Sequence, residues 1–163
     1  MLKELQFLKN VYDIDIGYPA EFPQLTLHAQ RILTALRLEK SDKLEAASKA
    51  FWKLYWHDEK SITSPTDLFA YLSPIVGPDH AKRLIEKDSQ SPTVKSALIE
   101  ATKEAVEKYG AFGAPWFVVE RALDKQQMTF FGSDKLETIA WFLSQKYEGP
   151  CPPGYKNSTS SKL

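Results

Sequence analysis

Apolar residues recur at steps of three and four through the first two-thirds of the chain, a spacing typical of amphipathic helices. This spacing predicts helices over residues 2–12, 27–38 and 41–56. Thr26 precedes the second of these helices, and its side-chain oxygen could cap the first free amides. The stretch 13–24 carries one glycine and two prolines between the first two helices, so we expect an extended connector there.

Three further helices are predicted from a shared signal, a cap-type residue directly before a proline. Proline suits the first position of a helix because its missing amide is not needed there. The three pairs are Ser64-Pro65, Gly77-Pro78 and Ser91-Pro92. The last helix should run to Tyr109 and end at Gly110, a residue suited to a helix C-cap. Residues 26–110 are therefore predicted to form an all-helical domain whose aromatic stripe is core.

After the helical block the pattern changes to strands. Two short runs rich in aromatic and β-branched residues, 115–119 and 128–131, are joined by a polar turn and predict an antiparallel hairpin. A final helix, predicted from Ser133 to Leu143, should pack on this hairpin. Four segments result: an initial helix and connector at 1–25, the helical domain at 26–110, a hairpin and helix at 111–149, and a flexible tail at 150–163.

The charge balance and hydropathy limit the classes of partner. Lysine plus arginine number 21, as do aspartate plus glutamate, so no net basic field draws the chain to nucleic acid or to an anionic membrane surface. No stretch approaches the roughly eighteen consecutive apolar residues of a membrane span. The first residues also lack the apolar run of a signal peptide. We therefore expect an intracellular protein with neither a nucleic-acid nor a membrane partner.

Few residues are candidates for redox or metal chemistry. Cys151 is the single cysteine, so no disulfide and no Cys-x-x-Cys pair can form within the chain. The three histidines, His28, His57 and His80, are far apart in the sequence and form no zinc motif with cysteine. We interpret them as structural or surface residues and expect no metal cofactor.

The first candidate site is the segment Gly110-Ala-Phe-Gly-Ala-Pro115. Its two glycines permit unusual backbone angles or close approach, and the bond before Pro115 lies where a cis peptide is tolerated. A proline at the start of a strand leaves the backbone of the preceding residue, Ala114, exposed for pairing with an extended peptide-like ligand. The alternative is a helix stop followed by an edge-strand proline.

The second candidate site is Gly132-Ser133-Asp134, at the predicted start of the final helix. Free amides and the positive end of a helix dipole can receive a carboxylate there, while Asp134 could hold an ammonium group. The zwitterionic end of an amino acid would satisfy both. The alternative is that Ser133 is an ordinary N-cap and Asp134 a favourable acid in the first turn. A functional role is favoured because the two candidates flank one hairpin.

The third signal is the C-terminal tripeptide formed by Ser161, Lys162 and Leu163. This ending is a peroxisomal address that an import receptor reads, and it follows a polar tail that would leave it accessible. We therefore expect a peroxisomal protein, alongside a cytosolic pool, with the import receptor as a partner.

Two stretches and the tail that follows them together resemble the kappa-class glutathione transferases, relatives of bacterial DsbA and of 2-hydroxychromene-2-carboxylate isomerases. The stretches are KYGAFGAPWFVV at 108–119 and FFGSDKLETIAWFL at 130–143, followed by a tail rich in glycine and proline. The helical block is similar too, so the resemblance covers essentially the whole chain. It implies an α/β, thioredoxin-like fold of the DsbA and kappa type, interrupted by a helical domain, and a homodimer.

The resemblance also implies a glutathione site. In that site the backbone of Ala114, before the cis-proline Pro115, pairs with the cysteinyl unit, and Ser133 and Asp134 hold the γ-glutamyl end. The family more often has a larger apolar residue at the position of Ala114, a change that a backbone contact would survive. Glutathione would be the co-substrate, with its thiolate adding to a small electrophile or reducing a peroxide. The alternatives are the related glutathione-dependent isomerase and a non-catalytic binding or dimerisation module.

The chain departs from the family pattern at its start. Family members begin with a strand-helix-strand unit whose serine stabilises the glutathione thiolate, and this sequence starts after it, at the helix 2–12. We therefore expect an N-terminally truncated, mostly helical form with one C-terminal hairpin and no catalytic residue of its own. Transferase activity should be weak or absent, because a thiol that is not activated stays mostly protonated near neutral pH.

Overall fold

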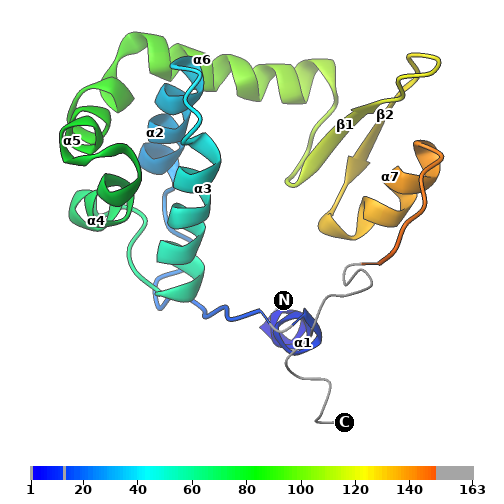
Figure 1. Cartoon of the computed structure of the whole chain (residues 1–163), viewed down its shortest axis with the longest axis horizontal. Coiled ribbons are helices and arrows are strands. Elements are labelled where there is room, and N and C mark those ends of the chain that lie inside the picture. The colour runs from blue at the N-terminus through cyan, green and yellow to red at the C-terminus, as the bar shows by residue number, and fades with distance from the viewer. Residues whose placement is uncertain (1, 13, 150–163) are drawn as a thin grey trace. The chain divides into compact units, whose positions relative to one another are not determined.

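A computed structural model describes residues 2–12 and 14–149 of the 163-residue chain. The chain forms two compact units, one made of residues 15–101 and the other of the N-terminal segment up to Ile14 and the chain from Thr102 onward. Within the described residues, helices dominate and the sheet has two strands, as predicted (Figure 1). The four-segment division at residues 25, 110 and 149 stays a prediction.

The unit formed by residues 15–101 is helical. Its helices are α2 (Leu27–Leu38), α3 (Leu44–Trp52), α4 (Pro65–Val76), α5 (Pro78–Glu86) and most of α6 (Pro92–Lys103). A π-helical turn, Lys53–His57, continues α3, so the predicted helix 41–56 is confirmed as a helical stretch that starts later and changes its winding. A short 3₁₀ segment, Asp88–Gln90, precedes α6.

Two of the predicted N-cap serines accept a hydrogen bond in the first turn of their helix, whereas the predicted N-cap threonine does not. Ser64 caps α4, since its hydroxyl accepts a hydrogen bond from the Asp67 amide at 3.2 Å, and Ser91 accepts one from the Val94 amide at 3.3 Å. The prediction for Thr26 is wrong, because its side chain makes no capping bond. Its backbone angles, φ −86° and ψ 3°, are not the extended ones that turn a cap oxygen toward the first turn.

Apolar side chains from α2 to α6 form the core of the helical unit. The largest of those that are fully buried are Ile32, Leu36, Leu54, Leu68, Leu72 and Leu84. Burying one such side chain stabilises the fold by about 1.5–3 kcal/mol. His28 on α2 supports this core, because its Nε2 lies 3.1 Å from the Ile85 carbonyl oxygen and 3.2 Å from the Ser89 hydroxyl. The structural role predicted for His28 is thus confirmed.

The second unit contains the sheet. Its elements are α1 (Leu2–Tyr12), a π-helical turn that continues α6 (Glu104–Lys108), β1 (Trp116–Glu120), β2 (Gln127–Phe131) and α7 (Leu136–Phe142). The strands form the predicted antiparallel hairpin, with Trp116 opposite Phe131 and Glu120 opposite Gln127. The final helix starts later than predicted, because residues 133–135 form a 3₁₀ turn before it.

Helix α7 packs on one face of the hairpin. The rings of Phe130 on β2 and Phe142 on α7 are both buried, with their centroids 6.1 Å apart. Arg121, which follows β1, donates a hydrogen bond to the Phe142 carbonyl oxygen at 3.2 Å and lies over the Phe142 ring. These contacts confirm the predicted packing of the final helix.

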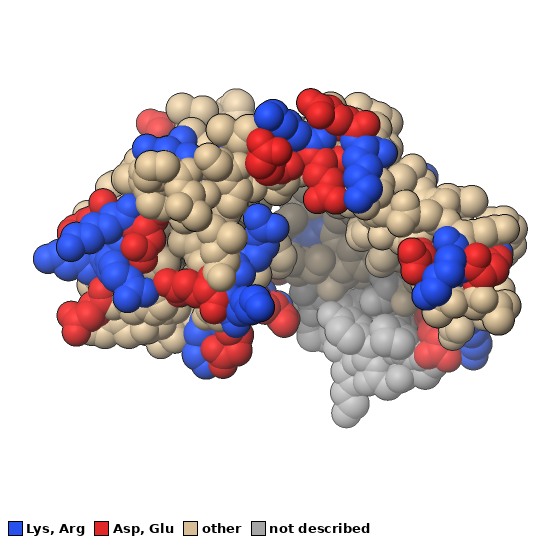
Figure 2. Space-filling model, turned by 90° about the horizontal axis from the view of Figure 1, so that it is seen from above, with Lys and Arg blue, Asp and Glu red and all other residues tan. Residues whose placement is uncertain are grey.

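Charged side chains of both signs are mixed on the surface. On the face seen in Figure 2, lysine and arginine alternate with aspartate and glutamate, and neither sign covers a large area. Among the described residues, no helix is both long enough and apolar enough to span a membrane.

Candidate functional site

The segment between α6 and β1 leaves the helix through a glycine. Gly110 has a φ of 68°, and its amide donates to the Val106 carbonyl oxygen at 3.0 Å. The next amide, of Ala111, donates to Ala105 at 2.9 Å. The predicted C-cap role of Gly110 is confirmed, and the Ala114–Pro115 peptide bond is cis, as predicted.

A backbone hydrogen bond brings the two candidate segments together. The Gly132 amide donates to the Pro115 carbonyl oxygen at 3.1 Å, one step beyond the pairing of Trp116 with Phe131. The antiparallel pairing therefore continues by one residue pair beyond the start of β1 and the end of β2. As a result, the end of the first candidate segment lies beside the start of the second.

Ala114 presents its backbone at this end of the hairpin. The residue is exposed, and neither its amide nor its carbonyl has a hydrogen-bond partner within the described part of the chain. Unpaired backbone groups beside a strand are the ones that an extended ligand can use, because it adds to the ladder as a further strand would.

Gly113 allows the loop to pass close to an aromatic ring. A Cβ atom at Gly113 would lie 2.8 Å from a ring carbon of Phe131, which is too close for an unshifted side chain. The ring of Phe131 also packs against Phe112, with centroids 4.7 Å apart, and Phe112 packs against Trp116 at 5.2 Å. The loop thus carries a small aromatic cluster, formed by Phe112, Trp116 and Phe131.

The predictions from sequence missed this aromatic cluster. Its members are separated along the chain, and only the strand register places Trp116 opposite Phe131. One signal in the sequence could have indicated the cluster: Phe112 is a large apolar residue that lies between two glycines in a loop. In the structure its side chain is 75% exposed. An exposed aromatic surface beside free backbone groups is suited to the apolar part of a ligand.

Ser133 and Asp134 lie in the 3₁₀ turn that follows Gly132. Ser133 is exposed and makes no capping hydrogen bond, so the alternative of an ordinary N-cap is wrong. The first turn of α7 begins only at Leu136, so these two residues are not at its first turn.

Asp134 is a carboxylate at neutral pH. Its side chain is 70% exposed and accepts a hydrogen bond from the Lys135 ammonium group. This hydrogen bond is the main cause that lowers the pKa of Asp134 below its ordinary value. The carboxylate can therefore hold a ligand ammonium group in exchange for that of Lys135.

Some predicted residues lie outside the described residues, namely Cys151 and the tripeptide Ser161, Lys162 and Leu163. Within the described ranges, no cluster of histidine, cysteine, aspartate and glutamate has the grouping of a metal site.

Comparison with known proteins decides the family. Residues 1–144 match the family model of the DSBA-like thioredoxin domain. The chain is 36% identical to human glutathione S-transferase kappa 1 over 159 residues, which cover 94% of this chain and 69% of the human protein. This chain belongs to the kappa class of glutathione S-transferases.

Further relatives agree with this kappa-class assignment. The rat glutathione S-transferase kappa 1 is 33% identical over 94% of this chain and 69% of its own length. The glutathione S-transferase kappa 2 of Caenorhabditis elegans is 30% identical over 92% of this chain and 68% of its own length. The predicted family and its DsbA-like thioredoxin fold are thus confirmed, and the kappa-class chain spans about two-thirds of these relatives.

Proposed function

We propose that this kappa-class chain binds glutathione at the end of its hairpin, between the segments 110–115 and 132–134. The observation that carries the proposal is the hydrogen bond from the Gly132 amide to the Pro115 carbonyl oxygen. It holds the unpaired backbone of Ala114 close to the turn that carries Asp134. The glutathione in the names of the relatives supports the choice of ligand.

Each part of the site has a separate task in this proposal. The amide and carbonyl of Ala114 pair with the cysteinyl unit of glutathione, as in the addition of a strand. Asp134 binds the ammonium group of the γ-glutamyl end, and the Ser133 hydroxyl bonds the neighbouring carboxylate. The aromatic cluster of Phe112, Trp116 and Phe131 borders the thiol with apolar surface.

The reaction proposed is that of a thiol nucleophile. Glutathione loses its thiol proton to solvent, and the thiolate sulfur forms a bond to an electrophilic carbon while the leaving group departs. With a peroxide as oxidant, two glutathione molecules are instead oxidised to the disulfide, and the peroxide is reduced to an alcohol and water, or to water alone if it is hydrogen peroxide. Both reactions need the thiolate, since the thiol is a poor nucleophile.

We expect weak thiolate activation from the two site segments. They contain no histidine and no cysteine, and the neighbouring Lys135 is already bonded to Asp134. Ser133 carries the one side-chain hydroxyl of these two segments, and it is already assigned to the γ-glutamyl carboxylate. This composition also favours a second candidate, a module that binds glutathione without turnover.

The remaining proposals concern assembly and location. The resemblance to the kappa class implies a homodimer, and the word transferase in the names of the relatives supports a small electrophile as second substrate. The tripeptide Ser161-Lys162-Leu163 supports recognition by the peroxisomal import receptor.

Thermal unfolding with and without glutathione tests the binding site. A ligand present at about 100 Kd stabilises a protein by about 2.7 kcal/mol. At about 2–4 °C per kcal/mol for a chain of this size, Tm should rise by roughly 5–11 °C. Asp134→Ala removes a hydrogen bond to a charged group, about 1.5–3 kcal/mol, so glutathione should bind roughly 10- to 150-fold more weakly.

Glu137→Ala is the matched control, because Glu137 is an exposed acid close by on α7. This variant loses the same charge and should keep the full rise in Tm. No rise with the unmodified chain would refute glutathione binding, and a full rise with Asp134→Ala would refute the site. Turnover of an activated aromatic chloride distinguishes the two candidates: binding without turnover fits the module, and fast turnover contradicts weak activation.

A further inference from the structure

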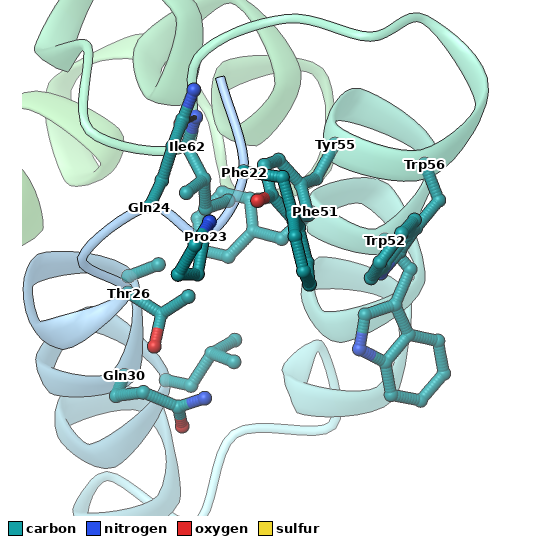
Figure 3. Close-up of a pocket in the computed structure, with 12 residues that line it drawn as sticks. Phe22, Pro23, Gln24, Thr26, Gln30, Phe51, Trp52, Tyr55, Trp56 and Ile62 are labelled. Atoms are coloured by element: carbon teal, nitrogen blue, oxygen red, sulfur yellow. Dashed lines mark hydrogen bonds between the residues drawn. The ribbon is translucent and has the colours of Figure 1, made fainter. Parts of the chain in front are cut away.

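A cavity of about 320 Å³ lies within the helical unit, between α2 and α3 and beside the extended segment 22–24 (Figure 3). All of its lining residues belong to residues 15–101. The volume is at the lower end of the range of about 300–1,000 Å³ that small-molecule sites occupy. The cavity therefore has room for a molecule with one or two rings.

Aromatic side chains make up most of one wall. They are Phe22, Phe51, Trp52, Tyr55 and Trp56. The Trp56 ring packs at 5.8 Å from Phe22 and 5.0 Å from Tyr55, measured between centroids, so the wall is held together by its own contacts. Trp52 is the most exposed of the five, at 61%, followed by Phe22 at 39%. Flat apolar faces of this kind favour a flat aromatic ligand.

The segment that closes the cavity is hydrogen-bonded to a loop that is distant in the sequence. The Gln24 side-chain oxygen accepts hydrogen bonds from the Ile62 amide at 3.0 Å and from the Ser61 hydroxyl at 3.3 Å. These bonds hold Phe22 and Pro23 over the helices. The cavity is therefore part of the folded unit and does not depend on a ligand for its shape.

Polar groups with no partner face the aromatic wall. Thr26 and Gln30 are exposed and lie one helical turn apart, and their side chains make no hydrogen bond within the described chain (Figure 3). An amide such as that of Gln30 can both donate and accept. The hydroxyl of Tyr55, a residue only 7% exposed, also lacks a partner among the described residues. The cavity thus offers the exposed hydrogen-bonding groups of Thr26 and Gln30, whereas the Tyr55 oxygen is itself buried.

The lining carries no formal charge at neutral pH. It contains aromatic, aliphatic, amide and hydroxyl side chains, and no lysine, arginine, aspartate or glutamate. A charged molecule would lose its hydration there without gaining an ion partner, which is unfavourable. The cavity should therefore select neutral ligands.

We propose that this cavity binds a small, neutral aromatic molecule of one or two rings that carries one hydrogen-bonding oxygen. The rings stack on the wall that includes Phe51 and Trp52, and the oxygen bonds to Thr26 and Gln30. This site is distinct from the proposed glutathione site, since its residues belong to the other compact unit and it excludes charged ligands.

Calorimetric titration of the full chain with β-naphthol tests the proposal. We expect saturable binding of one molecule per chain, and binding of the charged analogue β-naphthoate at least about tenfold weaker. Trp52→Ala removes the exposed stacking surface and should weaken β-naphthol binding about tenfold. The matched control is Trp141→Ala, because Trp141 is similarly exposed, at 73%, but lies on α7. This control should bind β-naphthol as the unmodified chain does.

Gln30→Ala tests the polar side at an exposed position where folding should be unaffected. It should weaken β-naphthol about two- to tenfold and leave binding of naphthalene, which has no oxygen, unchanged. Absence of saturable β-naphthol binding would overturn the proposal. Equal losses in Trp52→Ala and Trp141→Ala would also overturn it, as would β-naphthoate binding as tight as that of β-naphthol. Such a result would leave the glutathione site untouched.

Discussion

Gly132→Ala should damage both the fold and the proposed glutathione site. Gly132 has φ 108° and ψ 146°, a backbone conformation that is essentially restricted to glycine. Gly77, before α5, has nearly the same conformation, with φ 86° and ψ 151°. An alanine at either position should cost about 1–3 kcal/mol of stability. The pair therefore provides two variants with the same backbone strain.

The two glycines differ in their surroundings. A Cβ atom at Gly132 would collide with the carboxylate of Asp134, whereas one at Gly77 would meet nothing within 4 Å. Gly132→Ala must therefore displace Asp134 as well as strain the backbone. If Asp134 holds the ammonium group of glutathione, losing that bond costs about 1.5–3 kcal/mol, which is roughly 10- to 150-fold in affinity.

Thermal unfolding and calorimetric titration with glutathione separate the two effects. Both variants should lower Tm by roughly 2–12 °C, from about 2–4 °C per kcal/mol. Unfolding should be followed by more than one probe, because two compact units need not melt together. Only Gly132→Ala should lose glutathione affinity. Unchanged affinity in Gly132→Ala, with stability lowered as in Gly77→Ala, would refute our placement of Asp134 in the site.

Two further predictions concern the helical unit. Ser64→Ala should lower the free energy of unfolding by about 1 kcal/mol because a capping bond is lost, whereas Thr26→Ala should change it by less than about 0.5 kcal/mol. Urea denaturation measures both, and equal losses would contradict the assignment of the caps. The Tyr71 hydroxyl donates a hydrogen bond to the Asp58 carboxylate, which raises the pKa of Tyr71 to about 12. From neutral pH up to about pH 10 the stability from this bond should be complete, and it should fall as pH rises towards 12. Ultraviolet titration should show the late titration of Tyr71, and Asp58→Asn should remove it.

The hairpin and its cis-proline were predictable because their signals are local. Alternating strand residues, a polar turn and a proline at the strand entry all lie within about twenty positions of one another. The register was not predicted; in the structure it places the candidate residues Ala114 and Ser133 at the same end of the hairpin.

Other features depend on contacts or angles that no local pattern reveals. Thr26 is a cap-type residue before a helix, yet its backbone angles keep its oxygen from capping. Ser133 has the same residue chemistry, but Gly132 with its positive φ leads into a 3₁₀ turn and α7 begins later. Both residues are of a type that can cap a helix, but the backbone conformation keeps their side chains from capping one.

The sequence did not predict the cavity in the helical unit, for a related reason. The aromatic residues of α3 have helical spacing, so we interpreted the stripe as core. Phe51 and Tyr55 are indeed buried, at 3% and 7% exposure, but Trp52 is 61% exposed. The bond between Gln24 and Ile62, which closes the cavity, joins residues 38 positions apart. Such a long-range contact leaves no periodic signal.

The bond between Gly132 and Pro115 makes the proposed site depend on strand length as well as on residue identity. A one-residue insertion or deletion in either strand would exchange the two faces of that strand and slide Ala114 away from Asp134. All of the ligand-binding side chains would still be present in such a chain. Descendants of this sequence could therefore lose the proposed glutathione binding without any substitution at the site, and a motif search would still find the site in them.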